Sequence, residues 1–417
     1  MAPYRRLGRR AGGWVAHGTD GQNEPVPRFE PFRAVRYAPD VDLDAVIAPP
    51  YDVLSDTDVD ALAARDPHNI VHVDVPRGGA DRYEVAGALL RQWLDDGVLV
   101  RDDAPSFTLY RMRFTDAAGT PRDLVGVLGG LEVVDEGAGG VLPHERTTPK
   151  ASTDRLDLTR ATDANLSPVW GLSLASGLTE LLVEPGEPVG SVTVDGVEHV
   201  VERVGDADRV AAIAEHVGSD DVLIADGHHR YGVSRIHRDD VRAATGRTDL
   251  PAEETLAFVG ELVGDQLSIE AIHRLYTGVS FDDLRAALAT RFDLSPAERP
   301  TPATLATMEA DGRLVLVGAG GTAEWLTPKP GAFDDVRALD GAWLEATLDG
   351  TAAAVTYQHG LDEAVAAVDA GAATAAVLIR PVSIGEIERT AREGLLMPPK
   401  STFFTPKLRT GFVIRTL

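Results

Sequence analysis

Cysteine is absent from this chain of 417 residues, and no apolar run approaches the roughly 20 residues that span a bilayer. The absence of thiols excludes disulfides, thiolate metal sites and cysteine nucleophiles. We therefore expect a cytoplasmic protein with no membrane segment. The N-terminus carries arginines but no apolar stretch behind them, so we interpret residues 1–30 as a mobile tail rather than a secretory signal.

Positive charge is also scarce, because the net charge is −25 and only four of the 40 basic residues are lysines. Nucleic-acid binding depends on basic surface that neutralises phosphates. We therefore expect a small-molecule substrate rather than a nucleic-acid partner, and self-association stays open. An ammonium is a compact point charge that a guanidinium does not replace at a phosphate. The four lysines are candidate anion contacts, although GC-rich codon usage explains them equally well: Lys150, Lys329, Lys400 and Lys407.

Strand and helix patterns alternate from about residue 33 to the end, which predicts a mixed α/β (α+β) fold. Helical spacing is found in 83–97 and 207–218, strand patterns in 69–76 and 106–114, and a hairpin pattern in 190–204 that turns at Asp195-Gly196. The length predicts two or three domains. We place an N-terminal α/β part at 31–125, a central part at 126–245 and a C-terminal α/β part at 246–417.

The most informative segment is "LIADGHHRYGVSRI", residues 223–236. An apolar strand is followed by Asp226, which we expect to cap the following helix. The free amides and the dipole of a helix N-terminus attract anions. Gly227 lets a ligand approach the backbone, and Arg230 is able to bind phosphate oxygens in bidentate fashion. His228 and His229 lie between them. A capped surface helix is the alternative, but the pattern favours a phosphate site.

A second segment, "GVLPHERTTPK" (140–150), places Glu145 beside His144 in an irregular stretch. A carboxylate held there is suited to act as a general base or to bind a metal ion. By itself the segment is equally consistent with a solvated loop. The segment ends at Lys150, and further polar groups follow it at Asp154, Arg155 and Asn165.

A third segment, "MPPKSTFFTPKLRTG" (397–411), contains two lysines, two hydroxyls and a pair of phenylalanines between prolines. It is consistent with a lid over an anionic ligand and equally with a rigid loop whose aromatic rings fill the core. His273 and Arg274 in "IEAIHRLY" are a further polar pair. The common phosphate-binding and hydrolase motifs are absent: there is no Walker loop, no G-x-G-x-x-G after a strand, no G-x-S-x-G and no H-E-x-x-H.

These segments, together with "PPYDVLSD", "PHNIVHVDVPRG", "DRLDL", "ANLSPVW" and "YQHG", resemble the prokaryotic family known as domain of unknown function 1015. The resemblance runs from about Phe32 to the C-terminus. The Pro-His-Glu segment and the later Asp-Gly-His-His-Arg turn are also similar, more distantly, to ParB/sulfiredoxin-like proteins, in particular free L-serine kinases. This second resemblance implies a ParB/sulfiredoxin-like central module with N- and C-terminal α/β extensions. It also implies that Glu145 is the base acting on the serine hydroxyl and that residues 226–230 hold nucleotide phosphates. The long segment between Glu145 and Asp226 departs from the kinase pattern.

The main hypothesis is a phosphotransferase that uses ATP or ADP with Mg²⁺ on a small-molecule hydroxyl such as that of free serine. One alternative is a metal-dependent hydrolase built on His144, Glu145, Asp226, His228 and His229. Another is a non-catalytic, ParB-like nucleotide switch. The predicted catalytic residues are Glu145, His144 and His229; the predicted phosphate-binding residues are Asp226, Gly227, His228, Arg230, Lys400, Ser401, Thr402 and Lys407; the predicted substrate-binding residues are Lys150, Arg155, Asn165, His273 and Arg274.

Overall fold

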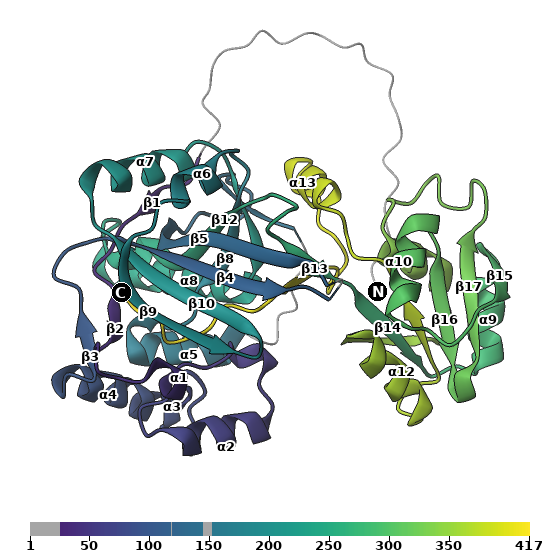
Figure 1. The fold of residues 1–417 in the computed structure, drawn as a ribbon, viewed down its shortest axis with the longest axis horizontal. Helices are drawn as coiled ribbons and strands as arrows, with labels where there is room; N and C mark the ends of the chain where they lie inside the picture. The colour runs from purple at the N-terminus through teal and green to yellow at the C-terminus, as the bar shows by residue number, and fades with distance from the viewer. Residues whose placement is uncertain (1–25, 118, 145–151) are drawn as a thin grey trace, which may run out of the picture.

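A computed structural model of the chain describes residues 26–117, 119–144 and 152–417. These residues form two lobes, each built around its own sheet (Figure 1). The predicted mixed α/β class is confirmed. No helix in the described part of the chain has the length and apolarity needed to cross a membrane.

The first lobe contains a nine-stranded sheet with the order β6-β11-β8-β12-β5-β4-β10-β9, and β1 pairs with β5. Its strands are β1 (Phe29–Glu30), β4 (Phe107–Thr115), β5 (Pro121–Glu132), β6 (Val141–Pro143), β8 (Val169–Ser173), β9 (Glu187–Val194), β10 (Val197–Val204), β11 (Val222–Asp226) and β12 (Glu254–Glu261). The accompanying helices are α1 (Leu43–Val46), α2 (Asp56–Arg65), α3 (Val71–Asp74), α4 (Arg82–Asp95), α5 (Ser152–Thr162), α6 (Leu178–Leu182), α7 (Ala207–Val217) and α8 (His228–Thr245).

Successive side chains of a strand point to opposite faces of the sheet, so apolar residues lie on both faces. On β11, for example, Val222 and Ile224 join one core and Leu223 and Ala225 the other. Residues of α6, α7 and α8 cover the first face. The second face is covered largely by residues 387–413, near the end of the chain.

The second lobe, residues 271–379, has a six-stranded sheet with the order β15-β17-β16-β19-β14-β18. Its strands are β14 (Ile272–Thr277), β15 (Phe292–Pro296), β16 (Leu314–Gly318), β17 (Ala323–Pro328), β18 (Ala354–His359) and β19 (Ala375–Leu378). Its helices α9 (Phe281–Leu288) and α11 (Asp340–Leu348) pack on one face, and α10 (Pro302–Asp311) and α12 (Leu361–Asp369) on the other.

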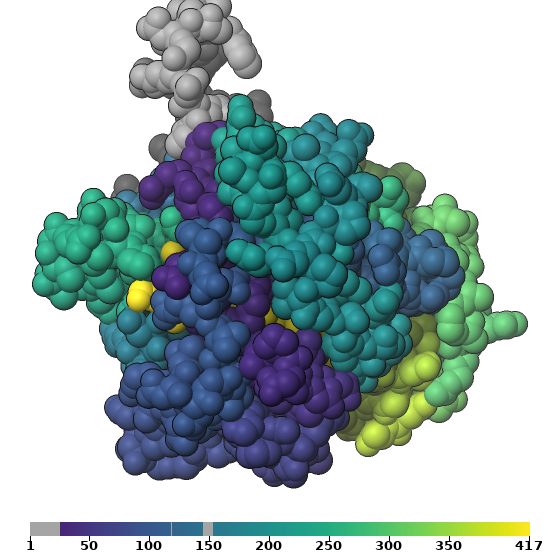
Figure 2. Space-filling view, turned by 60° about the vertical axis from the view of Figure 1, so that its left-hand side comes forward, coloured from purple at the N-terminus to yellow at the C-terminus, as the bar shows by residue number. Residues whose placement is uncertain are grey.

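After β19 the chain returns to the first lobe through α13 (Ile384–Arg392). There β20 (Phe403–Thr405) pairs with β13 (Ser268–Glu270), and β21 (Arg415–Thr416) pairs with β7 (Ala164–Asn165). In Figure 2, yellow C-terminal residues are visible among the purple and blue N-terminal ones. The nine-stranded sheet thus contains strands from all three parts expected from the sequence, with boundaries at residues 125 and 245. The second lobe is an insertion before the final segment.

Local predictions had two outcomes. The hairpin at Asp195-Gly196 is confirmed, because β9 and β10 pair around it and both turn residues have the positive φ that a type I′ turn needs (53° and 76°). The strand predicted at 69–76 is wrong, since it contains the helical turn α3. The Asn69 side chain accepts from the Val71 amide at 3.0 Å and donates to the Ala45 carbonyl at 2.8 Å, which stabilises a turn despite the alternating pattern.

Candidate functional site

The candidate site is a corner where two parallel strands end side by side. β6 and β11 are paired so that Pro143 lies opposite Ile224. The residues that follow the two strands therefore emerge at the same edge of the sheet. His144 comes directly after β6, and Gly227 comes directly after β11. Two segments that are about 80 positions apart in the sequence are thereby brought together.

Gly227 makes the turn from β11 into α8. Its φ of 87° lies in the left-handed region, and a Cβ atom there would come within 3.0 Å of the Arg230 Nε. Gly227 itself is the N-cap of α8, and no side chain of the described residues caps the helix. The predicted capping role of Asp226 is therefore wrong. The first amides of a helix have no partner within it, so a polar ligand is able to bind them.

Asp226, the last residue of β11, pairs with two cations. Its Oδ1 lies 3.1 Å from the Lys407 Nζ, and its Oδ2 lies 2.6 Å from the Arg230 Nη2. Burial alone would raise the pKa of Asp226, but Lys407 and Arg230 hold it well below its ordinary value. The carboxylate therefore stays ionised, and the three side chains leave one excess positive charge beside the N-terminus of α8. Arg230 also donates to the Pro168 carbonyl, so its guanidinium is fixed by protein groups on two sides.

The His144 ring connects β11 to the C-terminal segment. Its Nδ1 lies 2.5 Å from the Ile224 carbonyl oxygen, and its Nε2 lies 2.7 Å from the Thr402 hydroxyl. A carbonyl only accepts, so Nδ1 carries the proton and Nε2 accepts from Thr402. Burial lowers the pKa of His144 to about 4, which keeps the ring neutral at pH 7. Both ring nitrogens are engaged, so this histidine positions its neighbours.

The two histidines of the turn have different surroundings. The His228 ring lies 4.8 Å from that of His144, and its Nε2 is 3.4 Å from the His144 amide nitrogen. Burial and the neighbouring His144 hold the pKa of His228 well below its ordinary value. His229 is half-buried, and its pKa is lowered by burial and by the charge of Lys400. Both rings are therefore neutral at pH 7. A neutral imidazole is still able to donate one hydrogen bond to an anion.

The 397–411 segment, for which a lid and a rigid loop were equally expected, contacts this corner. The Met397 amide donates to the His144 carbonyl at 2.8 Å, and the Ser401 hydroxyl donates to the Pro398 carbonyl at 2.7 Å. The Lys407 Nζ lies 4.4 Å from the centre of the Phe403 ring. His144, Thr402 and Lys407 thus connect all three segments that the sequence singled out.

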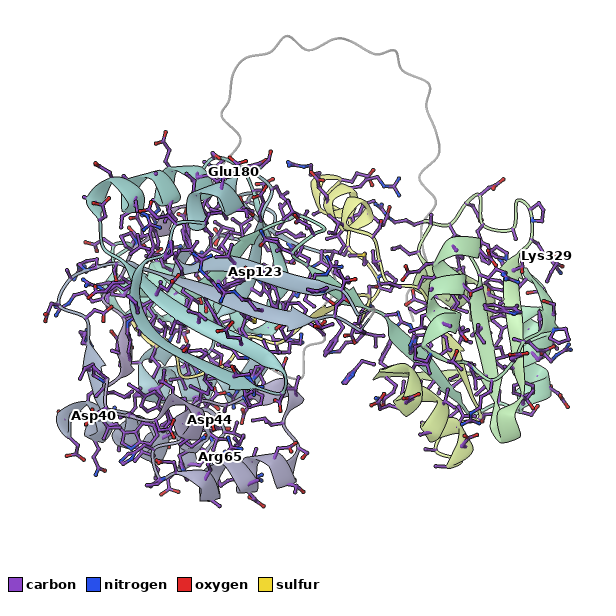
Figure 3. All side chains as sticks on the ribbon, viewed as in Figure 1. Asp40, Asp44, Arg65, Asp123, Glu180 and Lys329 are labelled. Carbon is purple, nitrogen blue, oxygen red and sulfur yellow. The ribbon has the colours of Figure 1, made fainter. Side chains whose placement is uncertain are left out.

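The second lobe contacts the same segment. The Phe403 ring is stacked on that of His359 at the end of β18, with centres 4.6 Å apart. Arg274 of β14 donates to the Lys400 carbonyl at 3.0 Å, and Lys400 adopts a positive φ of 59°. His273 is buried, and its Nδ1 accepts from the Ile379 amide at 3.3 Å. His273 and Arg274 therefore lie between the lobes or inside the second one, rather than at the corner. Lys329 is also in the second lobe, where its ammonium donates to the Ala289 carbonyl at 2.6 Å (Figure 3).

Two predicted residues, Glu145 and Lys150, lie outside the described residues. Asn165 is buried in β7, where its side-chain oxygen accepts from the Leu256 amide at 2.9 Å. Arg155 is buried in α5 and donates to the backbone and side chain of Asp74 at 2.7 and 3.2 Å. Arg155, Asn165 and Arg230 line a small cavity of about 40 Å³ beside the corner.

Sequence reasoning missed other residues of this cavity. Tyr51, Asp74 and Ser167 line it, and the charge of Asp52, next to Tyr51, acts on His229. Tyr51 and Asp52 belong to the "PPYDVLSD" segment, which carried part of the family resemblance but no stated role. A tyrosine and an aspartate directly after two prolines were the available signal.

Metal binding was the other chemistry considered. In the part of the chain that the structure describes, no group of three or more histidine, aspartate or glutamate side chains is arranged to hold a metal ion. His144 uses both ring nitrogens and Asp226 both carboxylate oxygens in contacts with protein groups. The described residues do not fit the predicted metal-ligand set.

Solved structures that are distantly similar to this chain include the following three. A conserved hypothetical protein from Pyrococcus furiosus is 11% identical, with a TM-score of 0.37 over 66% of this chain and 92% of that one. A free serine kinase variant in complex with ADP is 12% identical, with a TM-score of 0.36 over 65% and 89%. SbnI from Staphylococcus aureus, truncated at its C-terminus, is 13% identical, with a TM-score of 0.37 over 69% and 87%. Likenesses this distant carry no argument about the site.

No curated protein matches the chain. Residues 29–342 match the family described as "Protein of unknown function (DUF1015)", which is more than half of the sequence. The chain therefore belongs to the DUF1015 family.

Proposed function

We propose that this protein is a nucleotide-dependent phosphotransferase that acts on the hydroxyl of a small molecule. The observation that supports this most is the excess positive charge of Asp226, Arg230 and Lys407 beside the N-terminus of α8. Backbone amides and neighbouring cations bind and neutralise phosphate oxygens, and phosphoryl transfer depends mainly on such positioning and neutralisation. The motif resemblance to free L-serine kinases directs the proposal to ATP or ADP as donor and to serine-like acceptors.

In this proposal the groups of the corner have separate roles. The α8 amides, Lys407 and Lys400 bind the phosphates. Asp226 holds Lys407 and Arg230 in place, and Arg230 is a positioning residue because protein groups already occupy two sides of its guanidinium. Mg²⁺ bound to the nucleotide would neutralise part of the phosphate charge. His144 fixes the 397–407 segment above β11.

Glu145, the residue directly after His144 in the chain, is the proposed base. It takes the proton from the acceptor hydroxyl as that oxygen forms a bond to the terminal phosphorus of the nucleotide. The bond between this phosphorus and the bridging oxygen breaks at the same time. ATP then yields ADP, or ADP yields AMP, together with the phosphorylated acceptor, and Glu145 releases its proton to solvent.

The test is incubation of the purified protein with Mg²⁺, ATP or ADP and free serine, followed by mass spectrometry for phosphoserine. We expect product with the native protein and a loss of at least about a hundredfold in rate for Glu145→Gln, since general-base catalysis typically contributes that much. Glu136→Gln is the matched control, because Glu136 is an exposed glutamate of the same region. Nucleotide binding without product over long incubation would indicate the non-catalytic switch instead. Full activity in Glu145→Gln would remove Glu145 from the mechanism.

A further inference from the structure

The small cavity beside the corner is lined by polar residues from five separate segments, of which Asp74 and Arg155 are buried. Tyr51 precedes α2, Asp74 ends α3, Arg155 lies on α5, Ser167 follows β7, and Arg230 lies on α8. Arg230 also pairs with Asp226, so it belongs to the cavity and to the corner. A molecule in the cavity would therefore lie next to the proposed phosphate site.

Asp74 is the charged group of this cavity with the weakest set of partners. It is only 3% exposed, its Oδ1 lies 3.2 Å from the Arg155 Nη1, and its Oδ2 lies 3.5 Å from the Ser167 hydroxyl, a long hydrogen bond. Arg155 pairs with two carboxylates, because its Nε and Nη2 both donate to Asp154 while its Nη1 donates to Asp74. Burial raises the pKa of Asp74, and Arg155 and Arg230 only partly oppose this. A cationic ligand group would complete the solvation of this buried carboxylate.

The size of the cavity limits what it is able to hold. Its 40 Å³ corresponds to about three water molecules, at the roughly 10–15 Å³ that one water needs. The narrow space favours a small compound over a sugar or a nucleoside. Tyr51 and Ser167 both line it, and because the Ser167 hydroxyl already bonds that of Thr410 at 2.9 Å, we expect a ligand to bond chiefly to the Tyr51 hydroxyl.

We infer that this cavity is the acceptor subsite, and that the acceptor is a small alcohol that carries an ammonium group held by Asp74. The inference rests on the proposed phosphotransferase function, because it takes the corner as the phosphate site. The ammonium is bound at Asp74, and the hydroxyl is directed toward Arg230 and the corner. The acceptor class is then small amino alcohols and hydroxy amino acids, rather than neutral or purely anionic alcohols.

The experiment is isothermal titration calorimetry of the full chain, saturated with ADP in the presence of EDTA so that no phosphoryl group is transferred, using ethanolamine, serine and glycerate as probes. We expect the two ammonium compounds to bind and glycerate to bind at least about tenfold more weakly, since a hydrogen bond between charged groups is typically worth that factor. Asp74→Asn should weaken ethanolamine and serine by about tenfold or more. Tyr51→Phe, which keeps the ring that stacks on Arg155 at 4.1 Å, should weaken them by a few-fold and leave the fold intact.

The matched control is Asp340→Asn, which removes a buried, arginine-paired aspartate from the second lobe. It should leave both ammonium compounds and ADP unaffected. Equal affinities for glycerate and serine, or unchanged affinities in both Asp74→Asn and Tyr51→Phe, would overturn the inference. Binding of ADP to the native protein is measured first. A protein that does not bind ADP contradicts the proposed function, whereas one that binds ADP but neither ammonium compound contradicts only the acceptor subsite.

Discussion

Lys407→Met tests whether the C-terminal segment completes the corner. The ammonium lies 3.1 Å from Asp226, and the two side chains are 14% and 22% exposed, so the interaction is mostly shielded from solvent. A hydrogen bond between charged groups contributes about 1.5–3 kcal/mol. Arg230 still neutralises the other carboxylate oxygen at 2.6 Å, so we expect a loss near the lower end, about 1.5–2 kcal/mol. This corresponds to a decrease in Tm of about 2–3 °C for a chain of this length.

The same substitution should weaken nucleotide binding by about tenfold, because one cation near the phosphates is worth on the order of 1.4 kcal/mol. The measurements are thermal unfolding, with and without ADP, and calorimetric titration of ADP. Lys329→Met is the control, since it changes the net charge equally but removes an ammonium that binds a carbonyl in the second lobe. Equal ADP affinities for both variants and the native protein would refute the role of Lys407.

The effect on stability should depend on pH in a defined direction. The pKa of Asp226 is lowered in the folded state, so its pairing stabilises the protein above the ordinary value of 3.8 and is lost as the pH falls below it. The Tm difference between native protein and Lys407→Met should therefore be constant from pH 7 to 5 and decrease below about pH 4. A difference that grows on acidification would contradict this assignment.

The remaining predictions concern the turn and His144. Gly227→Ala should lower the unfolding free energy by about 1–2 kcal/mol, as measured by thermal unfolding, because φ is 87° and the new Cβ would press on Arg230. The control is Gly232→Ala in the same helix, whose Cβ would meet no described atom within 4 Å. It should be neutral or stabilising in the same assay. Thr402→Val should cost about 1–2 kcal/mol by leaving the buried Nε2 of His144 without a donor, whereas Thr402→Ser should not. The pKa of His144 is about 4 in the folded protein, so the unfolded chain binds more protons between pH 6.5 and 4. The stability of the native protein should therefore decrease as the pH is lowered from 6.5 to 4. The decrease should be smaller in His144→Asn, as a pH series of Tm values would show.

Local features near the site were predictable because they depend on neighbours in the sequence. The strand, turn and helix around Asp226 follow from an apolar run, a glycine and helical spacing. The error there was one of detail: Gly227 takes the N-cap position, and the Asp226 carboxylate is bound by Lys407 and Arg230 instead of helix amides. Lys407, which is 181 positions away and binds the Asp226 carboxylate, cannot be inferred from the local sequence pattern.

The cavity could not be predicted for the same reason. Asp74 ends a segment whose alternating residues indicate a strand, and only the folded chain shows that this segment is a helical turn against Arg155. The pairing of Asp74 with Arg155 matters chemically because both side chains are buried. That burial depends on packing between segments that are 81 positions apart. Sequence could indicate Arg155 as a polar candidate but not the carboxylate it contacts.

The order of the segments explains why the second lobe matters to a corner made almost entirely by the first. The chain leaves the first lobe after β13 and returns to it only with α13, so the segment that carries Thr402 and Lys407 follows the insertion. Two contacts then hold this segment from the side of the second lobe: Arg274 on the Lys400 carbonyl, and His359 stacked on Phe403. Phe403 in turn lies against Lys407, which pairs with Asp226. A displacement of the second lobe would therefore act first on Lys407 at the proposed phosphate site, while the α8 amides and Arg230, which the first lobe holds alone, would keep their positions.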